Sequence, residues 1–219
     1  MASAGMQESQ LNQLTKEVAE MATIARSGFL QAWRAFLEAD LDMARDVIVR
    51  DEKLNVLAEK IFKMSLRLIA LQAPVATDLR TIGSYLKMVT DLERIGDLSV
   101  SIAKVVVRLN GAGYHLSLFE MPLMVERVKE MLDVCVQAIE SGDFRRLRLL
   151  DEMDDVIDGY YSKCFDYIEC NMERQPELIK EGVQLLKVLQ SLERIGDHAT
   201  NIGEWSLYMS TGNIADLNT

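Results

Sequence analysis

The chain has 219 residues, 49% of them hydrophobic, with a formal net charge of −10 and a pI near 4.8. Such a surface repels a phosphate backbone, so nucleic acid is excluded as the expected partner. The polar N-terminus predicts no signal peptide, and no apolar run approaches the roughly eighteen residues of a membrane span, so direct membrane insertion is not expected. Three cysteines, an odd number, favour a reducing, cytoplasmic compartment.

Apolar residues recur every three or four positions through most of the chain, which predicts an all-α fold. Six helical segments are predicted, most of them long, over residues 8–37, 43–71, 77–109, 122–139, 143–171 and 176–209. Gly142 is predicted to end the fourth segment and Asp143 to cap the fifth, while Pro176 suits the first turn of the sixth. The stretch NGAGYHLSLFEMP, with two glycines and a proline, is the predicted linker.

An internal repeat divides these segments into two halves. The phrase LERIGD ends at Asp97 and again at Asp197, and RDEKLNVLAEKIF (50–62) aligns with MDDVIDGYYSKCF (153–165). A repeat of this length is too long for a solenoid unit and indicates a duplication. The sequence therefore predicts two similar three-helix bundles, residues 1–110 and 122–212, with a linker over 111–121 and a tail over 213–219.

The repeated phrase carries one pair of acids in each half. Glu93 and Asp97 are four residues apart, as are Glu193 and Asp197, so each pair lies on one side of its helix. On a helical wheel both acids of the first pair fall well away from the centre of the apolar sector. Taken alone, each pair could simply be a solvated helix face.

A second pair in each half changes this interpretation. Asp51 with Asn55, and Asp154 with Asp158, also stand four residues apart, and they lie within or at the edge of the apolar sectors of their helices. We therefore expect them to face neighbouring helices, where a carboxylate must be neutralised, paired or coordinated.

Two arrangements could supply the positive charge, and the spacing leaves both open. Arg94 and Arg194 could reach across to the carboxylates in a partly buried salt-bridge network. Alternatively, four oxygen-bearing side chains on two facing helices could bind a metal. Oxygen ligands suit magnesium, manganese or ferric iron, and carboxylates can also hold zinc. Because both halves carry the whole set, we favour the metal.

Further residues bear on this hypothesis. Gly96 and Gly196 lie in mid-helix, which is unfavourable unless a helix or ligand approaches the backbone there. Accessory roles are considered for Arg94, Arg194, His198 and Glu204. For His198 a helix-surface or capping role is favoured, and for Glu204 the opposite charge of its counterpart Lys104 weakens the case.

These stretches resemble the PhoU-like regulators of bacterial phosphate uptake. The resemblance rests on PVATDLRTIGSYLKMVTDLERIGDLSVSIAKVV, LLKVLQSLERIGDHATNIGEWSLYMSTG, VIVRDEKLN and DEMDDVID, and it covers nearly the whole chain. The family pattern is E/D-x-x-x-D on two helices of each bundle. Asp51 with Asn55 departs from it, because Asn55 offers an oxygen without a charge.

The resemblance implies a cytoplasmic, often dimeric, non-enzymatic protein that holds iron or zinc clusters, with other divalent ions in some members. It further implies negative regulation of phosphate uptake and of phosphate-starvation signalling. The implied partners are a phosphate sensor histidine kinase and the ATPase subunit of an ABC phosphate transporter, through which the protein lies peripheral to the membrane. The alternative hypotheses are a di-metal carboxylate enzyme and a metal-free helical scaffold. No Glu-x-x-His pair, phosphate loop or nucleophile pairing supports an enzyme.

Overall fold

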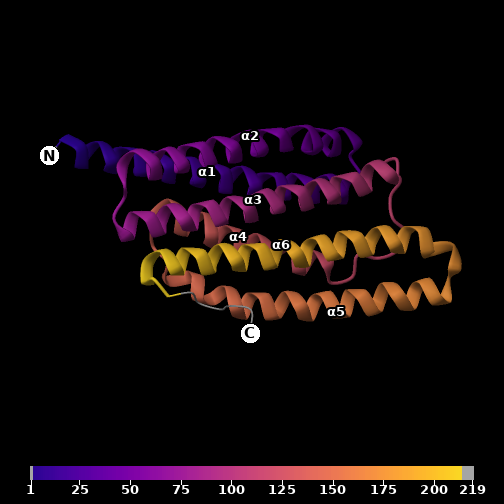
Figure 1. Ribbon diagram of the computed structural model, residues 1–219. Coiled ribbons are helices and arrows are strands. Elements are labelled where there is room, and N and C mark those ends of the chain that lie inside the picture. The colour runs from indigo at the N-terminus through magenta and orange to yellow at the C-terminus, as the bar shows by residue number, and fades with distance from the viewer. Residues whose placement is uncertain (1, 214–219) are drawn as a thin grey trace.

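The structure is a computed structural model that describes residues 2–213, with side chains from residue 9 onward (Figure 1). Within that range it contains six α-helices, two short 3-10 helices and no strand, which confirms the all-α prediction. The α-helices are α1 (Ala2–Glu38), α2 (Leu41–Gln72), α3 (Ala76–Arg108), α4 (Met121–Ser141), α5 (Leu150–Arg174) and α6 (Ile179–Thr211). Residues 214–219 of the predicted tail lie outside the described residues.

The helix boundaries follow from local side-chain chemistry. The Asp40 carboxylate accepts hydrogen bonds from the backbone N–H groups of Asp42 and Met43, both at 2.9 Å, and so caps α2. Gly142 ends α4 as predicted, because its φ of 69° suits a residue without a Cβ.

Three predicted helix starts were wrong. α1 begins at Ala2, six residues before the predicted Glu8. Residues Arg145–Leu149 form a 3-10 helix (η1), so α5 begins at Leu150 and not at Asp143. The Asp143 carboxylate accepts from both the backbone N–H and the guanidinium of Arg145, and this local turn replaces the helix cap. Pro176 likewise opens a short 3-10 turn (η2, Pro176–Leu178) before α6.

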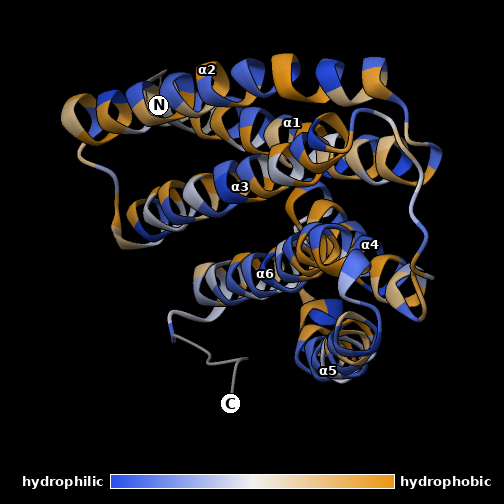
Figure 2. Ribbon diagram, turned by 90° about the vertical axis from the view of Figure 1, so that its right-hand side faces the viewer, coloured by the Kyte–Doolittle hydropathy of each residue, from blue (hydrophilic) through white to orange (hydrophobic). Residues whose placement is uncertain are grey.

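The two halves pack side by side along their third helices. α3 and α6 share the most extensive contact between any two helices, and they run next to each other in the middle of Figure 1. α1 and α4 also meet, with an ion pair between Arg26 and Asp133, whereas α2 and α5 contact only their own halves. One hydrophobic core extends through both bundles, and Figure 2 shows hydrophobic and hydrophilic residues alternating along each helix. α2 and α5 therefore form the outer edges of the pair.

The linker is held by contacts with both halves. The Glu181 carboxylate on α6 accepts hydrogen bonds from the backbone N–H groups of His115 and Leu116, both at 2.7 Å, and meets His115 Nδ1 at 3.0 Å. The ring of Tyr114 packs 4.5 Å from that of Phe36 on α1. Among the helices of residues 2–213, none is long and apolar enough to cross a membrane.

Candidate metal-binding carboxylate sites

The first candidate site lies between α2 and α3. Asp51 lies on α2 and its side chain meets α3 at Gly96, where a Cβ would come within 2.8 Å of Asp51 Oδ1. Real Cβ atoms are not found so close to another heavy atom, so glycine lets this carboxylate reach the α3 backbone. The close approach predicted from the mid-helix glycine is confirmed.

The acids of this site raise one another's pKa. The pKa of Asp51 lies above its usual value, first because of burial and then because of the negative charge of Asp97. The charge of Lys104 and the side-chain amide of Asn55 partly offset this increase in the pKa. The pKa of Glu93 is also raised, by burial and then by Asp97. α2 and α3 thus bring the first set of acids close enough to interact, although Asn55 and Asp97 are exposed.

The second candidate site, between α5 and α6, repeats this geometry. A Cβ on Gly196 would lie 3.1 Å from Ile157 Cδ1 and 3.3 Å from Asp154 Oδ1. Gly196 therefore gives Asp154 the same access to the inner helix that Gly96 gives Asp51. Asp154 Oδ1 is fully buried and has no hydrogen-bond partner among the described residues. A buried carboxylate oxygen without a hydrogen bond is unfavourable. Among the eight residues of the two sites, only Asp154 has such an oxygen.

The second site carries the stronger repulsion. Burial raises the pKa of Asp154 to about 7, with further contributions, in decreasing order, from the carboxylates of Asp197, Asp158, Glu193 and Asp155. Burial is also the first cause of the raised pKa values of Glu193 and Asp197. The two sites differ in the groups around the aspartate. Lys104 and Asn55 lower the pKa of Asp51, whereas Asp158, the counterpart of Asn55, adds a negative charge that raises the pKa of Asp154.

The arginines of the repeated phrase do not bridge the helices. Arg94 pairs at 3.2 Å with Asp97, three residues along the same helix, and both side chains are more than half exposed. Arg194 makes no ion pair in the described part of the chain and acts on Glu193 and Asp197 only through its charge. No arginine of this phrase holds Asp51 or Asp154, so the salt-bridge network considered from the sequence is not formed.

The two other accessory candidates lie elsewhere on α6. His198 Nδ1 meets Asp91 Oδ1 on α3 at 2.9 Å, and Asn201 donates to the same oxygen at 3.3 Å. His198 is therefore part of the contact between the halves, and neither the surface nor the capping role favoured from the sequence is correct. Glu204, two turns beyond Asp197, is not among the charges that raise the pKa values of the second site.

Sequence reasoning missed Asp91 and Asn201. A sequence signal for Asp91 was present next to the repeated phrase. TDLERIGD of the first half aligns with QSLERIGD of the second, so Asp91 corresponds to Ser191. An acidic residue present in only one copy indicates a contact that the duplicated scaffold does not require.

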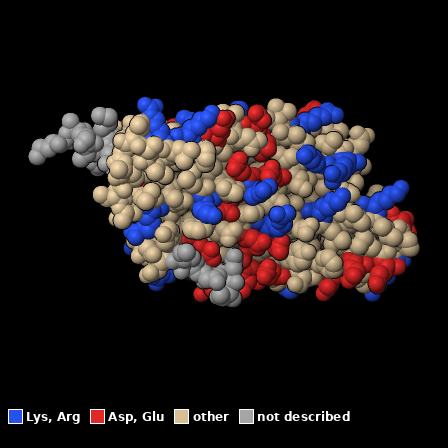
Figure 3. Space-filling view, viewed as in Figure 1, with Lys and Arg blue, Asp and Glu red and all other residues tan. Residues whose placement is uncertain are grey.

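The donor chemistry of both sites suits a hard cation. Figure 3 shows acidic side chains gathering near the middle of one face, over α2 and α3 and again over α5 and α6. Among residues 9–213, no group of three or more His, Cys, Asp or Glu side chains is arranged so that it could hold a metal ion. Coordination therefore requires the carboxylates to turn toward one another. The unpaired Asp154 Oδ1 and the glycine opposite it leave an oxygen free to do so.

Comparison with known proteins identifies the family. The PhoU domain matches residues 18–106 and again 121–206, one copy for each bundle. The chain belongs to the PhoU domain family. A Clostridium acetobutylicum protein named as a phosphate-specific transport system accessory protein PhoU homolog is 35% identical over 212 residues, covering 96% of this chain and 97% of its own length. A Rhizobium meliloti protein of the same name is 33% identical, covering 94% and 87%.

Solved structures of PhoU proteins share the whole fold. PhoU from Pseudomonas aeruginosa superposes with a TM-score of 0.90 at 28% identity, covering 94% of this chain and 99% of its own. The phosphate transport system regulatory protein PhoU from Streptococcus pneumoniae gives 0.89, also at 28% identity, covering 96% and 99%. The two matched PhoU domains, residues 18–106 and 121–206, contain all eight residues of the carboxylate sites.

Proposed function

We propose that this chain is a cytoplasmic regulatory adaptor of phosphate homeostasis and not an enzyme. It restrains phosphate uptake and phosphate-starvation signalling by linking the ATPase subunit of an ABC phosphate transporter to a phosphate sensor histidine kinase, and it acts as a homodimer at the membrane through these partners. The relatives are named as accessory and regulatory proteins of phosphate transport, which supports this proposal.

The proposal includes metal binding at the carboxylate sites. Asp154, Asp158, Glu193 and Asp197 would hold the ion in the second half, with Asp51, Asn55, Glu93 and Asp97 in the first. Iron or zinc is proposed, with magnesium or manganese as alternatives. A bound cation supplies the positive charge that the acids lack and holds the outer helix to the inner one. The single observation that carries this part is the buried, unpaired oxygen of Asp154 among four other carboxylates.

The second site is expected to bind more tightly than the first. All four of its side chains are carboxyl groups, whereas Asn55 contributes a neutral amide oxygen to the first. The number of charged ligands is one of the main determinants of affinity for hard cations. If metal fills the second site before the first in a titration, the result supports this proposal. Simultaneous filling would show that the two halves are equivalent.

A pull-down from phosphate-replete cells, with metal content measured on the same sample, tests the proposal. The tagged chain is compared with Asp154→Ala, Glu193→Ala and the control Asp166→Ala, which removes an exposed acid of α5 outside the site. The native chain and the control should carry metal and recover the kinase and the ATPase. The two site variants should lose metal and recover less of both partners, with unchanged helix content by circular dichroism.

Two results would contradict the proposal. Native protein prepared without chelator that contains no metal removes the metal claim. Partner recovery that falls only in step with helix content shows that the acids are structural, and the adaptor role then loses this support.

A further inference from the structure

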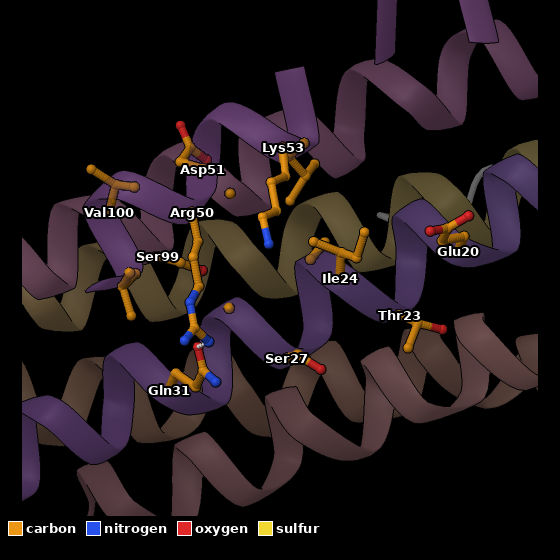
Figure 4. Close-up of a pocket in the computed structure, with 15 residues that line it drawn as sticks. Glu20, Thr23, Ile24, Ser27, Gln31, Arg50, Asp51, Lys53, Ser99 and Val100 are labelled. Carbon is orange, nitrogen blue, oxygen red and sulfur yellow. Dashed lines mark hydrogen bonds between the residues drawn. The ribbon is translucent and has the colours of Figure 1, made fainter. Parts of the chain in front are cut away.

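The first bundle contains a cavity that adjoins the first carboxylate site, with Asp51 and Gly96 in its wall. It lies between α1, α2 and α3, has a volume of about 360 Å³, and is bordered by Asp51 on one side (Figure 4). This volume falls near the lower end of small-molecule pockets, which span roughly 300–1,000 Å³. Its walls are mainly apolar, formed by side chains such as Ile24, Val47, Leu54 and Val100.

Two cationic side chains of α2 reach into this cavity. In Figure 4 the nitrogen ends of Arg50 and Lys53 extend toward α1, whereas the carboxylate of Asp51 lies on the other side, away from them. Lys53 has no ion-pair or hydrogen-bond partner among the residues with described side chains. Arg50 forms an ion pair with Asp46 and donates a hydrogen bond to Gln31, both at the long distance of 3.4 Å. In a chain of net charge −10, two weakly engaged cations in one cavity point to an anionic ligand.

The opposite wall offers space and hydrogen-bonding groups. Gly28 lies in mid-α1, where glycine costs about 1 kcal/mol relative to alanine, yet a Cβ there would meet nothing within 4 Å. No neighbour requires this glycine, and its missing side chain leaves the cavity open. Ser27 and Gln31, on the same helix, also line the cavity, and Gln31 lies beside Arg50 in Figure 4. Glu20, the remaining acid, lies at the far end in Figure 4.

The second half lacks these cations. With Asp51 aligned to Asp154, the positions of Arg50 and Lys53 correspond to Met153 and Val156. The duplicated scaffold therefore does not need positive charge here, and the pair belongs to the first bundle alone.

We propose that this cavity binds a small organic anion, with its phosphate or carboxylate group between Arg50 and Lys53 and its apolar part against Ile24 and Val100. Hydrogen bonds to charged groups and burial of the apolar part both contribute to affinity. The anion would bind on the side of α2 away from the Asp51 carboxylate, although the cavity shares Asp51 and Gly96 with the first carboxylate site. The test therefore uses protein freed of metal and of chelator.

The test is a titration followed by calorimetry and by the methyl NMR signals of Ile24 and Val100. The probes are phenyl phosphate, benzoate, inorganic phosphate and benzyl alcohol. Phenyl phosphate and benzoate are expected to bind with a Kd of about 1 mM or below and to shift both methyl signals, and their ratio tells which anionic group is preferred. Inorganic phosphate, which lacks the apolar part, and neutral benzyl alcohol should each bind at least about tenfold more weakly than the better of the two anions.

Variants locate the site. Arg50→Ala and Lys53→Ala remove exposed side chains and should each weaken binding about tenfold or more, while Lys63→Ala, an exposed lysine outside the cavity on the same helix, should change it less than about twofold. Gly28→Leu fills the cavity and should abolish binding without lowering the melting temperature. The proposal is overturned if neither anion binds, if benzyl alcohol binds as tightly as they do, or if Arg50→Ala and Lys53→Ala leave the affinity unchanged.

Discussion

Asp154→Asn tests whether repulsion between the Asp154 carboxylate and its acidic neighbours destabilises the folded protein. The pKa of this carboxyl rises from 3.8 to about 7 in the folded protein, through burial and then through Asp197. In the folded state the group therefore binds its proton more tightly than in the unfolded state. Its contribution to stability is present below pH 4 and is lost progressively as the pH rises to about 7. An amide of the same shape carries no charge and avoids this loss.

The magnitude follows from the size of the pKa change. Each pKa unit corresponds to about 1.4 kcal/mol, so the change sets a ceiling of about 4 kcal/mol on the free energy of unfolding. Because the side chain is only half buried, solvent screening reduces this, and we expect a gain of about 1–2 kcal/mol for metal-free Asp154→Asn above pH 7. For a chain of this size that corresponds to a rise of roughly 2–8 °C in the melting temperature.

The assay is urea unfolding of metal-free protein at pH 8 and at pH 5.5, with Asp166→Asn as the control for an exposed acid of the same helix. The gain should be about half as large at pH 5.5 and absent in the control. The same substitution should weaken metal binding. If Asp154→Asn is less stable than the native chain at both pH values, the carboxylate makes favourable contacts, and the reasoning about repulsion is refuted.

Three further substitutions test the geometry of the sites and of the contact between the halves. Gly96→Ala places a methyl group 2.8 Å from Asp51 Oδ1, whereas Gly83→Ala on the same helix meets nothing within 4 Å. In urea unfolding Gly83→Ala should be the more stable of the two by about 1 kcal/mol or more, and equal gains would contradict the close approach at Gly96. Asn55→Asp completes the pattern of the first half and should tighten its metal binding at least about tenfold in a metal titration with Asp154→Ala as background; unchanged affinity would show that charge at this position does not limit binding. Asp91→Ala leaves His198 and Asn201 without their acceptor and should cost about 1–3 kcal/mol in the same unfolding assay, and a neutral result would mean that this contact does not hold the halves together.

The fold and the location of the sites could be predicted because both depend on periodicity. Four-residue spacing puts Glu193 and Asp197 on one side of a helix whatever surrounds them, and the apolar sector of the fifth segment indicated that Asp154 faces a neighbour. The mid-helix glycines predicted a close approach, and Gly96 and Gly196 both have one. These inferences need only helix geometry, which the sequence determines locally.

The remaining features depend on distances between helices, which periodicity does not contain. Asn55 and Asp158 were expected to face the neighbouring helices. Asn55 lines a hollow together with Glu93 of α3, and the charge of Asp158 raises the pKa of Glu193 and Asp197 on α6. Both side chains are nevertheless exposed, because they lie at the open edge of the contact between helices. His198 was assigned to a surface or cap because Asp91, its partner, comes from the other half of the chain. The cavity beside Arg50 was likewise invisible, since it depends on the spacing of three helices.

The two halves differ where α2 and α5 face the repeated phrase, and this difference bears on how the duplication has been used. LERIGD is identical in both copies, and its glycine admits an aspartate from the outer helix in each. The outer helices then diverge around that aspartate. α2 carries Arg50, Lys53 and Asn55 where α5 carries Met153, Val156 and Asp158. Each change makes the first half more positive or less negative, so we expect the second half to favour a cation and the first half to favour an anion. Exchanging these three residues between α2 and α5 should exchange the preference for a cation and the preference for an anion between the halves. If the exchanged chain keeps the original preferences, the inner helices, not the outer ones, determine what each half binds.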